Sequence, residues 1–441
     1  MKKFGPVIAG VILIAVIALF GWLYFADYLE REKPSIRTDQ TLVSVGKQKN
    51  IGIEYTDNRS GLSIIRVEIT QEDQTRLIAE EMLSKRGTSK KLLPVTIDAA
   101  VLKLKNGPAV ITLSAEDHAL IKNRSVMTIP VQIDTIPPQI YPLNPLNYVN
   151  QGGTGFIVYR TSKPAPVNGV YVNDVFFPGY NLLLQGKPVS VVFFAMPLDG
   201  SNGRTRLTLF ARDDAGNEAR SQLSFHIREK KFRSDRVNLG ETFLNHKMPD
   251  FQTQVPELQD KPLHDVFAYI NSTLRGKNDQ TIAAICSTSV NRRLWDGAFL
   301  RMSNASSTAL FGDKRTYYID GKPYGASVHL GVDLASVAQA PIEAANSGKV
   351  VFTGDLGIYG NTVIIDHGLG LFSLYSHLSA IETEKGKDVA KGGKIGRSGL
   401  TGLAGGDHLH FSILAGGQFV NPQEWWDPNW IANNVTNKMS F

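Results

Sequence analysis

An uncharged apolar stretch near the start of the chain constrains its fold more than any other feature. No charged residue occurs between Phe4 and Phe25, and the stretch includes the aliphatic run from Val11 to Ile17. As a helix it spans about 33 Å, which is enough to cross the hydrocarbon core of a bilayer. Lys2 and Lys3 precede it, so the positive-inside rule places the N-terminus in the cytoplasm.

The same stretch is also compatible with a cleaved signal peptide. It is long for that purpose, and no clean Ala-x-Ala site precedes Asp27. We therefore expect residues 1–30 to form a cytoplasmic stub and a retained single-pass anchor in the inner (cytoplasmic) membrane. Both interpretations export residues 27–441, and the absence of wall-sorting signals favours a Gram-negative periplasm.

Composition limits the chemistry of this exported chain. It has 441 residues, which is enough for two to four domains, and a single cysteine, Cys286. One cysteine excludes an intramolecular disulfide and any multi-cysteine metal site, so a metal would need histidines and carboxylates. The net charge of +6 fits an anionic surface such as a membrane or a cell-wall polymer, but it does not choose between them. We expect no nucleic-acid partner.

Two similar β-rich segments follow the anchor, at 36–135 and 139–228. Their short runs of alternating apolar residues are typical of half-buried strands. Residues 111–117 resemble residues 207–213 at an offset of 96, and a polar turn follows each copy. Consecutive prolines at Pro137 and Pro138 favour an extended joint between them. The segments resemble tandem immunoglobulin-like modules of bacterial surface proteins, which would serve as spacers, docking modules or simple packing units.

A helical bridge is predicted over residues 235–304. Apolar residues at helical spacing predict an amphipathic helix over 260–276 that ends at Gly276. Asp279 is expected to cap a second helix. Cys286 is interpreted as a small buried residue, and Trp295 as a packing residue.

Five of the nine histidines fall between His329 and His410. In the segment from Val328 to Ala335, apolar residues alternate, so a strand would place His329, Gly331 and Asp333 on one face. Gly331 would leave room for an ion between two suitable zinc ligands. This spacing alone is a weak signal.

Two further elements carry histidines. His408 and His410 share one face of a predicted strand, which suits one metal ligand and one neutral base, or else a pair of surface histidines. His377 ends a predicted hairpin whose first strand is Thr362 to Asp366.

Together these elements resemble the lysostaphin/LytM-type zinc metallopeptidases that cut peptidoglycan peptides. The similarity covers about residues 311–427, and its elements occur in the order of the family. They are His329-Leu330-Gly331-Val332-Asp333, the segment Tyr359 to Gly368, Tyr375-Ser376-His377-Leu378, Val389 to Gly396 and Gly405 to Phe411.

The resemblance implies a role for each matched residue. His329, Asp333 and His410 would hold Zn²⁺, and His377 and His408 would be the two further catalytic histidines. Asn361 and Tyr359 would line the substrate groove, whereas Asp366 and His367 would either be structural or support the metal ligands. Ser412 stands where many members have Glu, but this is not a ligand position.

The resulting expectation is a mainly β chain. It comprises a transmembrane helix, two β-sandwich-like modules, a helical bridge and a C-terminal antiparallel metallopeptidase domain of the duplicated hybrid motif type over 305–430. The expected function is a membrane-anchored zinc metalloendopeptidase acting on stem peptides or cross-links of peptidoglycan. Which bond is cut stays open, and an envelope protein would regulate access. The alternatives are an activator of a cell wall amidase, from a family branch that typically loses zinc ligands, and a scaffold or adhesin.

Overall fold

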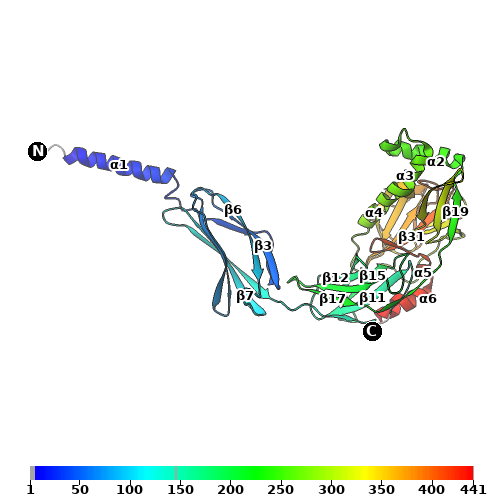
Figure 1. Ribbon diagram of the computed structural model, residues 1–441, viewed down its shortest axis with the longest axis horizontal. Helices are drawn as coiled ribbons and strands as arrows, with labels where there is room; N and C mark the ends of the chain where they lie inside the picture. Colours follow the sequence, from blue (N-terminus) through cyan, green and yellow to red (C-terminus); the bar gives the residue numbers. More distant parts are fainter. Residues whose placement is uncertain (1–4, 145–146, 441) are drawn as a thin grey trace. The chain divides into compact units, whose positions relative to one another are not determined.

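The computed structural model describes residues 5–144 and 147–440. Contacts divide the chain into two compact units. The first holds residues up to 138 with the short stretches 163–166 and 212–219, and the second holds the remainder. The chain is mainly β, as the sequence predicts, and its elements are shown in Figure 1.

The first unit begins with helix α1 (Gly5–Phe25), whose residues from Val7 onward have a mean hydropathy of 2.6 and are exposed on all sides. This helix is long and apolar enough to cross a membrane, and a signal sequence would have the same character.

Two sheets form the module that follows. Their orders are β1-β3-β6 and β2-β8-β7-β4-β5, and both contribute to one hydrophobic core. The strands are β1 (Ser35–Thr38), β2 (Ser44–Val45), β3 (Gln48–Thr56), β4 (Leu62–Gln71), β5 (Gln74–Met82), β6 (Lys90–Asp98), β7 (Gly107–Asp117) and β8 (Arg124–Ile133).

The second unit begins with another pair of four-stranded sheets, in the orders β14-β15-β11-β9 and β13-β12-β16-β17. A parallel pair, β10 with β18, joins them. The strands are β9 (Ile140–Pro142), β10 (Asn147–Asn150), β11 (Thr154–Thr161), β12 (Val167–Val172), β13 (Val175–Pro178), β14 (Tyr180–Leu184), β15 (Lys187–Ala195), β16 (Leu207–Arg212), β17 (Glu218–Gln222) and β18 (Phe225–Arg228).

The C-terminal part of this unit is built on one large sheet in the order β20-β23-β31-β27-β26-β25-β29, with β32 beside β31. Two three-stranded sheets, β24-β30-β28 and β19-β21-β22, complete it. The strands are β19 (Ser234–Asn238), β20 (Ser306–Ala309), β21 (Lys314–Ile319), β22 (Lys322–Val328), β23 (Val332–Ala335), β24 (Pro341–Glu343), β25 (Gly348–Asp355), β26 (Asn361–Asp366), β27 (Leu371–Ser376), β28 (Ala380–Ile381), β29 (Asp388–Val389), β30 (Lys394–Arg397), β31 (Leu409–Ala415) and β32 (Gln418–Val420).

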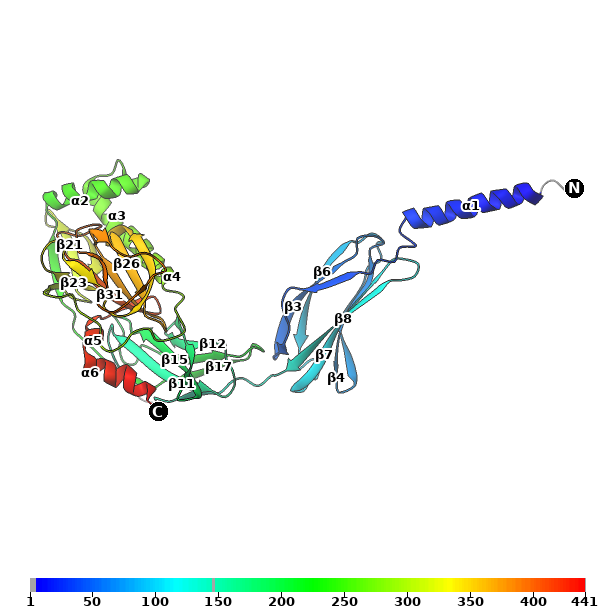
Figure 2. The same cartoon turned by 180° about the vertical axis from the view of Figure 1, so that it is seen from behind.

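Helices lie at both ends of this second unit, with α2 and α3 far from α6 in both views (Figures 1 and 2). They are α2 (Glu241–Gln254), α3 (Leu263–Tyr269), α4 (Arg275–Ile285), α5 (Gln423–Trp426) and α6 (Pro428–Ile431), with short turns η1 (Pro256–Leu258), η2 (Ile270–Leu274), η3 (Gly357–Tyr359), η4 (Ala432–Thr436) and η5 (Asn437–Met439).

The helical bridge differs from its prediction. Helical structure runs without a break from Leu263 to Ile285, so Gly276 does not end a helix. Asp279 caps nothing and accepts a hydrogen bond from the Tyr359 hydroxyl at 2.9 Å. Packing of α4 on the large-sheet domain outweighs the cost of a helical glycine, which is only about 1 kcal/mol. Helix α2, which contains Pro249, was not predicted.

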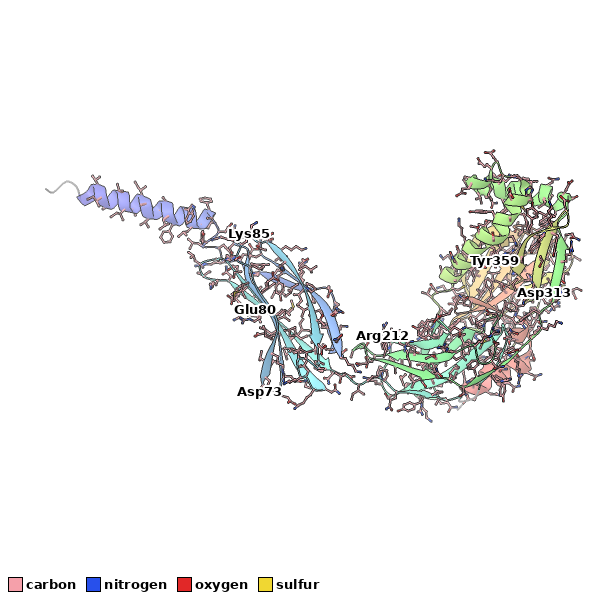
Figure 3. All side chains as sticks on the ribbon, viewed as in Figure 1. Asp73, Glu80, Lys85, Arg212, Asp313 and Tyr359 are labelled. Atoms are coloured by element: carbon pink, nitrogen blue, oxygen red, sulfur yellow. The ribbon has the colours of Figure 1, made fainter. Side chains whose placement is uncertain are left out.

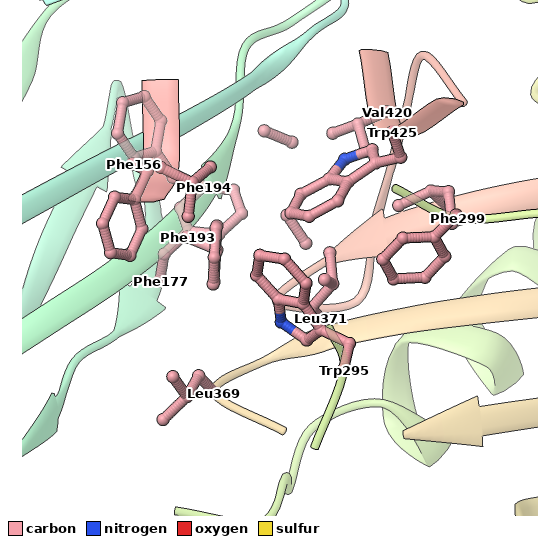
Figure 4. Close-up of a cluster of buried hydrophobic side chains, with 14 of the residues drawn as sticks. Phe156, Phe177, Phe193, Phe194, Trp295, Phe299, Leu369, Leu371, Val420 and Trp425 are labelled. Carbon is pink, nitrogen blue, oxygen red and sulfur yellow. The ribbon is translucent and has the colours of Figure 1, made fainter. Parts of the chain in front are cut away.

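One hydrophobic core joins the second β module to the C-terminal domain. Figure 4 shows its aromatic side chains, with Phe193 of β15 beside Trp425 of α5. Their ring centroids are 5.6 Å apart, and Trp295 lies 5.4 Å from Trp425 on the other side. Burial of such aromatics contributes strongly to stability, so the module and the C-terminal domain share one compact unit.

Candidate active site

The three predicted metal ligands converge at the centre of the large sheet. Asp333 of β23 is paired directly with His410 of β31, which places the two side chains next to each other. The Oδ1 atom of Asp333 lies 2.9 Å from His410 Nδ1 and 2.9 Å from His329 Nε2. The two imidazole nitrogens are 3.0 Å apart. The three side chains are at most 8% exposed.

The triangle formed by Asp333 Oδ1, His329 Nε2 and His410 Nδ1 has the size that a zinc ion requires. Bonds of 2.0–2.1 Å at tetrahedral angles place three ligand atoms about 3.3 Å from one another. The observed separations of 2.9 to 3.0 Å are close to that value, and two nitrogens with one carboxylate oxygen are a common donor set of catalytic zinc.

In His329 and His410, the ring nitrogen that faces away from the cluster forms a hydrogen bond. The nitrogen that faces the other two ligands is therefore free to bind a metal. His329 Nδ1 lies 3.0 Å from the carbonyl of Leu310 and donates to it. His410 Nε2 lies 3.1 Å from the hydroxyl of Ser412, which itself donates to the Leu330 carbonyl. Partners of this kind fix the tautomer and orientation of ligating histidines, so Ser412 supports His410 without being a ligand.

The segment before Asp333 is not the continuous strand that the alternation predicts. Strand β22 ends at Val328 and β23 begins at Val332, so His329 lies in the connection between them. A Cβ at Gly331 would lie 2.6 Å from His410 Nε2 and 2.6 Å from the Phe411 carbonyl oxygen. The glycine therefore makes room for the imidazole of His410 and the neighbouring backbone.

His377 and His408 lie beside the triangle. The His377 ring centroid is 4.9 Å from that of His408 and 5.8 Å from that of His410. His377 Nδ1 donates to the Thr401 carbonyl at 2.8 Å, and His408 Nδ1 donates to the Gly406 carbonyl at 2.8 Å. Among the described residues no partner contacts His377 Nε2, whereas His408 Nε2 lies 3.5 Å from Asp333 Oδ1. His377 directly follows β27 and has a φ of 62°, a conformation that is uncommon for non-glycine residues.

The cluster balances one buried negative charge against four imidazoles. Burial opposes ionisation of Asp333, but the adjacent His329 outweighs it and holds the pKa of Asp333 well below its usual value. Burial lowers the pKa of His410 to about 4 and that of His377 well below its usual range. Burial also opposes protonation of His408, but Asp333, with Oδ1 at 3.5 Å from Nε2, raises its pKa.

A cavity of about 370 Å³ adjoins the cluster. Of the two residues predicted to line a substrate groove, Tyr359 is among the lining residues of this cavity and Asn361 is not. The sequence did not predict that two arginines, Arg275 of α4 and Arg315 of β21, also line it. Neither lies in a recognisable motif, so only the folded structure brings them to the site.

Asp366 and His367 form hydrogen bonds away from the metal cluster. Asp366 accepts hydrogen bonds from Ser289 Oγ at 2.6 Å and from the Val290 amide at 2.8 Å. His367 is fully buried and lies 2.7 Å from Ser373 Oγ. These contacts hold the β26–β27 turn rather than the metal cluster.

Comparison with known proteins places this geometry in a family. Residues 327–422 match Peptidase family M23. The DD-carboxypeptidase/endopeptidase Mpg of Neisseria meningitidis serogroup B is 42% identical over 95 residues, which are 22% of this chain and 22% of that protein. The peptidoglycan DD-endopeptidase ShyA of Vibrio cholerae is 40% identical over 93 residues, or 21% of this chain and 22% of that protein. The chain thus spans about a fifth of the length of these curated relatives.

Solved structures include the catalytic domain of lysostaphin from Staphylococcus simulans. It is 27% identical, with a TM-score of 0.25, and the alignment covers 30% of this chain and 98% of that one. The family match contains all five histidine and aspartate residues of the cluster. The C-terminal part of this chain is therefore a peptidase domain of family M23, the family of the LytM and lysostaphin metallopeptidases.

Proposed function

We propose that the chain is a zinc metalloendopeptidase that hydrolyses peptide bonds in the stem peptides or cross-links of peptidoglycan. One observation carries this proposal. Three metal-binding atoms within 3.0 Å of one another share a cavity with two further histidines, His377 and His408. An amidase activator would need neither the complete ligand set nor the additional histidines.

Each residue of the cluster has a chemical role. His329, Asp333 and His410 would hold the ion, which when bound lowers the pKa of a water molecule and polarises the scissile carbonyl. Between them, His377 and His408 accept the proton of the attacking water and donate a hydrogen bond to the developing oxyanion. Tyr359 forms part of the wall of the cavity that receives the peptide.

The remaining parts of the chain position this domain. We propose that α1 is a single-pass anchor in the inner membrane with its N-terminus in the cytoplasm, so that the catalytic domain faces the periplasm and the peptidoglycan. The division into an anchor (1–30), β modules (36–135 and 139–228), a bridge (235–304) and a peptidase domain (305–430) belongs to the same proposal.

Digestion of purified peptidoglycan tests the activity. The full chain, solubilised in detergent and supplied with zinc, is incubated with the cross-linked polymer, and mass spectrometry identifies the soluble fragments. We expect peptide cleavage by the wild type and a loss of at least about 100-fold in His377→Ala, because one proton-transfer group is removed.

His226→Ala is the matched control, because His226 lies exposed on β18 of the second β module. It should cleave like the wild type. The proposal is wrong if the zinc-loaded wild type releases no fragments, or if His377→Ala cleaves as fast as His226→Ala.

A further inference from the structure

A second group of acidic residues meets far from the peptidase site, in the first β module. Glu30 comes from the segment between α1 and β1, Asp57 follows β3, and Asp117 ends β7. One carboxylate oxygen of each lies within 4.8 Å of the other two. The residues are 4%, 3% and 0% exposed, respectively. Three segments distant in sequence thus bring carboxylates to one buried point.

No basic side chain compensates this cluster. Among the described residues, none of the three carboxylates forms an ion pair with a lysine, arginine or histidine, and the nearby Arg59 pairs instead with Asp27 at 3.8 Å. Backbone amides donate to Asp57 and Asp117, but they do not cancel the charge. Burying several like charges without a counter-charge is costly.

The second β module repeats part of this arrangement. In the first module the Asn123 amide nitrogen donates to Asp117 Oδ1 at 2.9 Å, and its side-chain Nδ2 donates to Asp117 Oδ2 at 2.7 Å. In the second module Asn217 donates in the same two ways to Asp213, at 2.8 Å and 3.0 Å. The two aspartates are the last residues of the repeated segments.

The acidic residue that precedes the first module, Glu30, corresponds to the one that precedes the second, Asp134. Asn123 Nδ2 donates to the Glu30 carbonyl at 3.1 Å, and Asn217 Nδ2 donates to the Asp134 carbonyl at 2.7 Å. Glu30 in the first module therefore takes the place of Asp134 in the second.

The modules differ at the third position, and the difference identifies the ligand. In the second module Lys163, two residues after β11, places its ammonium 2.7 Å from Asp134 Oδ2 and 2.6 Å from Asp213 Oδ2. In the first module β3 pairs with β1 as β11 pairs with β9, and Asp57 directly follows β3, one residue nearer the strand end than Lys163 is in the repeat. The Lys163 ammonium thus joins the two acidic residues of the second module. The first module has a third carboxylate, that of Asp57, beside its two acidic residues.

We propose that the first module binds one Ca²⁺ ion on Glu30, Asp57 and Asp117, at the position that the Lys163 ammonium occupies in the repeat. The site offers only oxygen atoms, which are the ligands of hard cations. Calcium accepts six to eight oxygens in flexible geometry and so tolerates carboxylates from three separate segments, with water completing its shell. Bound calcium ties the segment that follows α1 to the ends of β3 and β7.

Calorimetric titration of the full chain tests the site. The protein, in detergent with one equivalent of zinc and free of calcium, is titrated with CaCl₂. We expect one Ca²⁺ per chain with a Kd at or below about 1 mM, as in extracellular modules, and a higher Tm in its presence. Asp57→Lys copies the second module and should abolish calcium binding while keeping the calcium-free Tm at least as high as in the wild type.

Two further variants complete the test. Asp57→Asn removes one ligand without adding a cation and should weaken binding at least about 10-fold. Asp73→Asn removes the same charge at the exposed tip of the β4–β5 hairpin (Figure 3) and should bind calcium like the wild type. The proposal is overturned if the wild type binds no calcium up to about 10 mM, or if both Asp57 variants bind it with wild-type affinity.

Discussion

Arg315 contacts the oxygen of Asp333 that does not face the two ligand histidines. Its Nη2 atom lies 3.5 Å from Asp333 Oδ2, whereas Oδ1 faces His329 and His410 at 2.9 Å. Partners of this kind hold a ligating carboxylate in one orientation. Arg315 comes from β21, outside residues 327–422 that match the family.

Removing this partner should weaken metal binding. We expect Arg315→Ala to lower zinc affinity by about 10- to 100-fold, measured by competition with a chromophoric chelator, and Arg315→Lys to recover part of the loss. Arg160→Ala, at an exposed position of β11, is the control and should bind zinc like the wild type. Equal affinity in Arg315→Ala and the wild type would show that Asp333 needs no such support.

Gly331 permits the close approach of His410, so its substitution should displace a ligand. A Cβ at this position would lie 2.6 Å from His410 Nε2, the Phe411 carbonyl oxygen and Ser412 Oγ. Gly331→Ala should therefore lose measurable zinc binding and peptidase activity while circular dichroism stays unchanged. Gly405→Ala is a control next to the same cavity, because nothing lies within 4 Å of the added Cβ. Wild-type zinc binding in Gly331→Ala would contradict the steric argument.

At the level of the elements, the strands that carry the site were predictable, because alternation of apolar and polar residues indicates a strand directly. The hairpin of β26 and β27, and the strand β31 that contains His410 and follows His408, agree with the pattern of apolar residues alone. The break before Asp333 was not predictable, since it depends on packing against His410 from a strand almost eighty residues later. Helix α2 was missed because it has few apolar residues and contains Pro249.

Helix α2 lies against the peptidase site, a contact that its sequence does not suggest. Phe243 in its first turn and Leu239 before it line the cavity of the metal cluster. One turn later Lys247, only 5% exposed, donates to the carbonyl of Leu400. The neighbouring Thr401 carbonyl accepts the hydrogen bond of His377, so α2 is fastened to the loop that orients this histidine.

Releasing this contact should expose the cavity to large substrates. A hydrogen bond to a charged group is worth about 1.5–3 kcal/mol, so Lys247→Met should raise the cleavage rate of cross-linked peptidoglycan by up to about 10-fold. Lys261→Met, at an exposed position before α3, should leave the rate unchanged. An unchanged or lower rate in Lys247→Met with unaltered zinc binding would show that α2 supports the site rather than restricting it.

For the whole molecule, the joint between the second β module and the peptidase domain carries a titratable group. Glu424 of α5 is 5% exposed and accepts hydrogen bonds from the Thr154 amide and from Asn150 Nδ2, both at 2.7 Å. Both partners belong to the module, so this carboxyl links the two parts of their common core. Sequence patterns could not show this link, because Glu424 is about 270 residues away from each of its two partners in the chain.

Burial raises the pKa of Glu424 to about 7, from an ordinary value of 4.5, although the hydrogen bonds and Lys230 oppose the rise. Between these two values the folded protein retains a proton that the unfolded chain has lost. The free energy of unfolding should therefore fall as pH rises through this window, by roughly 3 kcal/mol in total. Glu424→Gln cannot ionise, so its Tm should lose this part of the pH dependence, whereas exposed Glu384→Gln should behave like the wild type. Thermal unfolding of the zinc-loaded chain from pH 4.5 to pH 8 measures the difference. Parallel Tm curves for the wild type and Glu424→Gln would mean that Glu424 stays ionised at the joint.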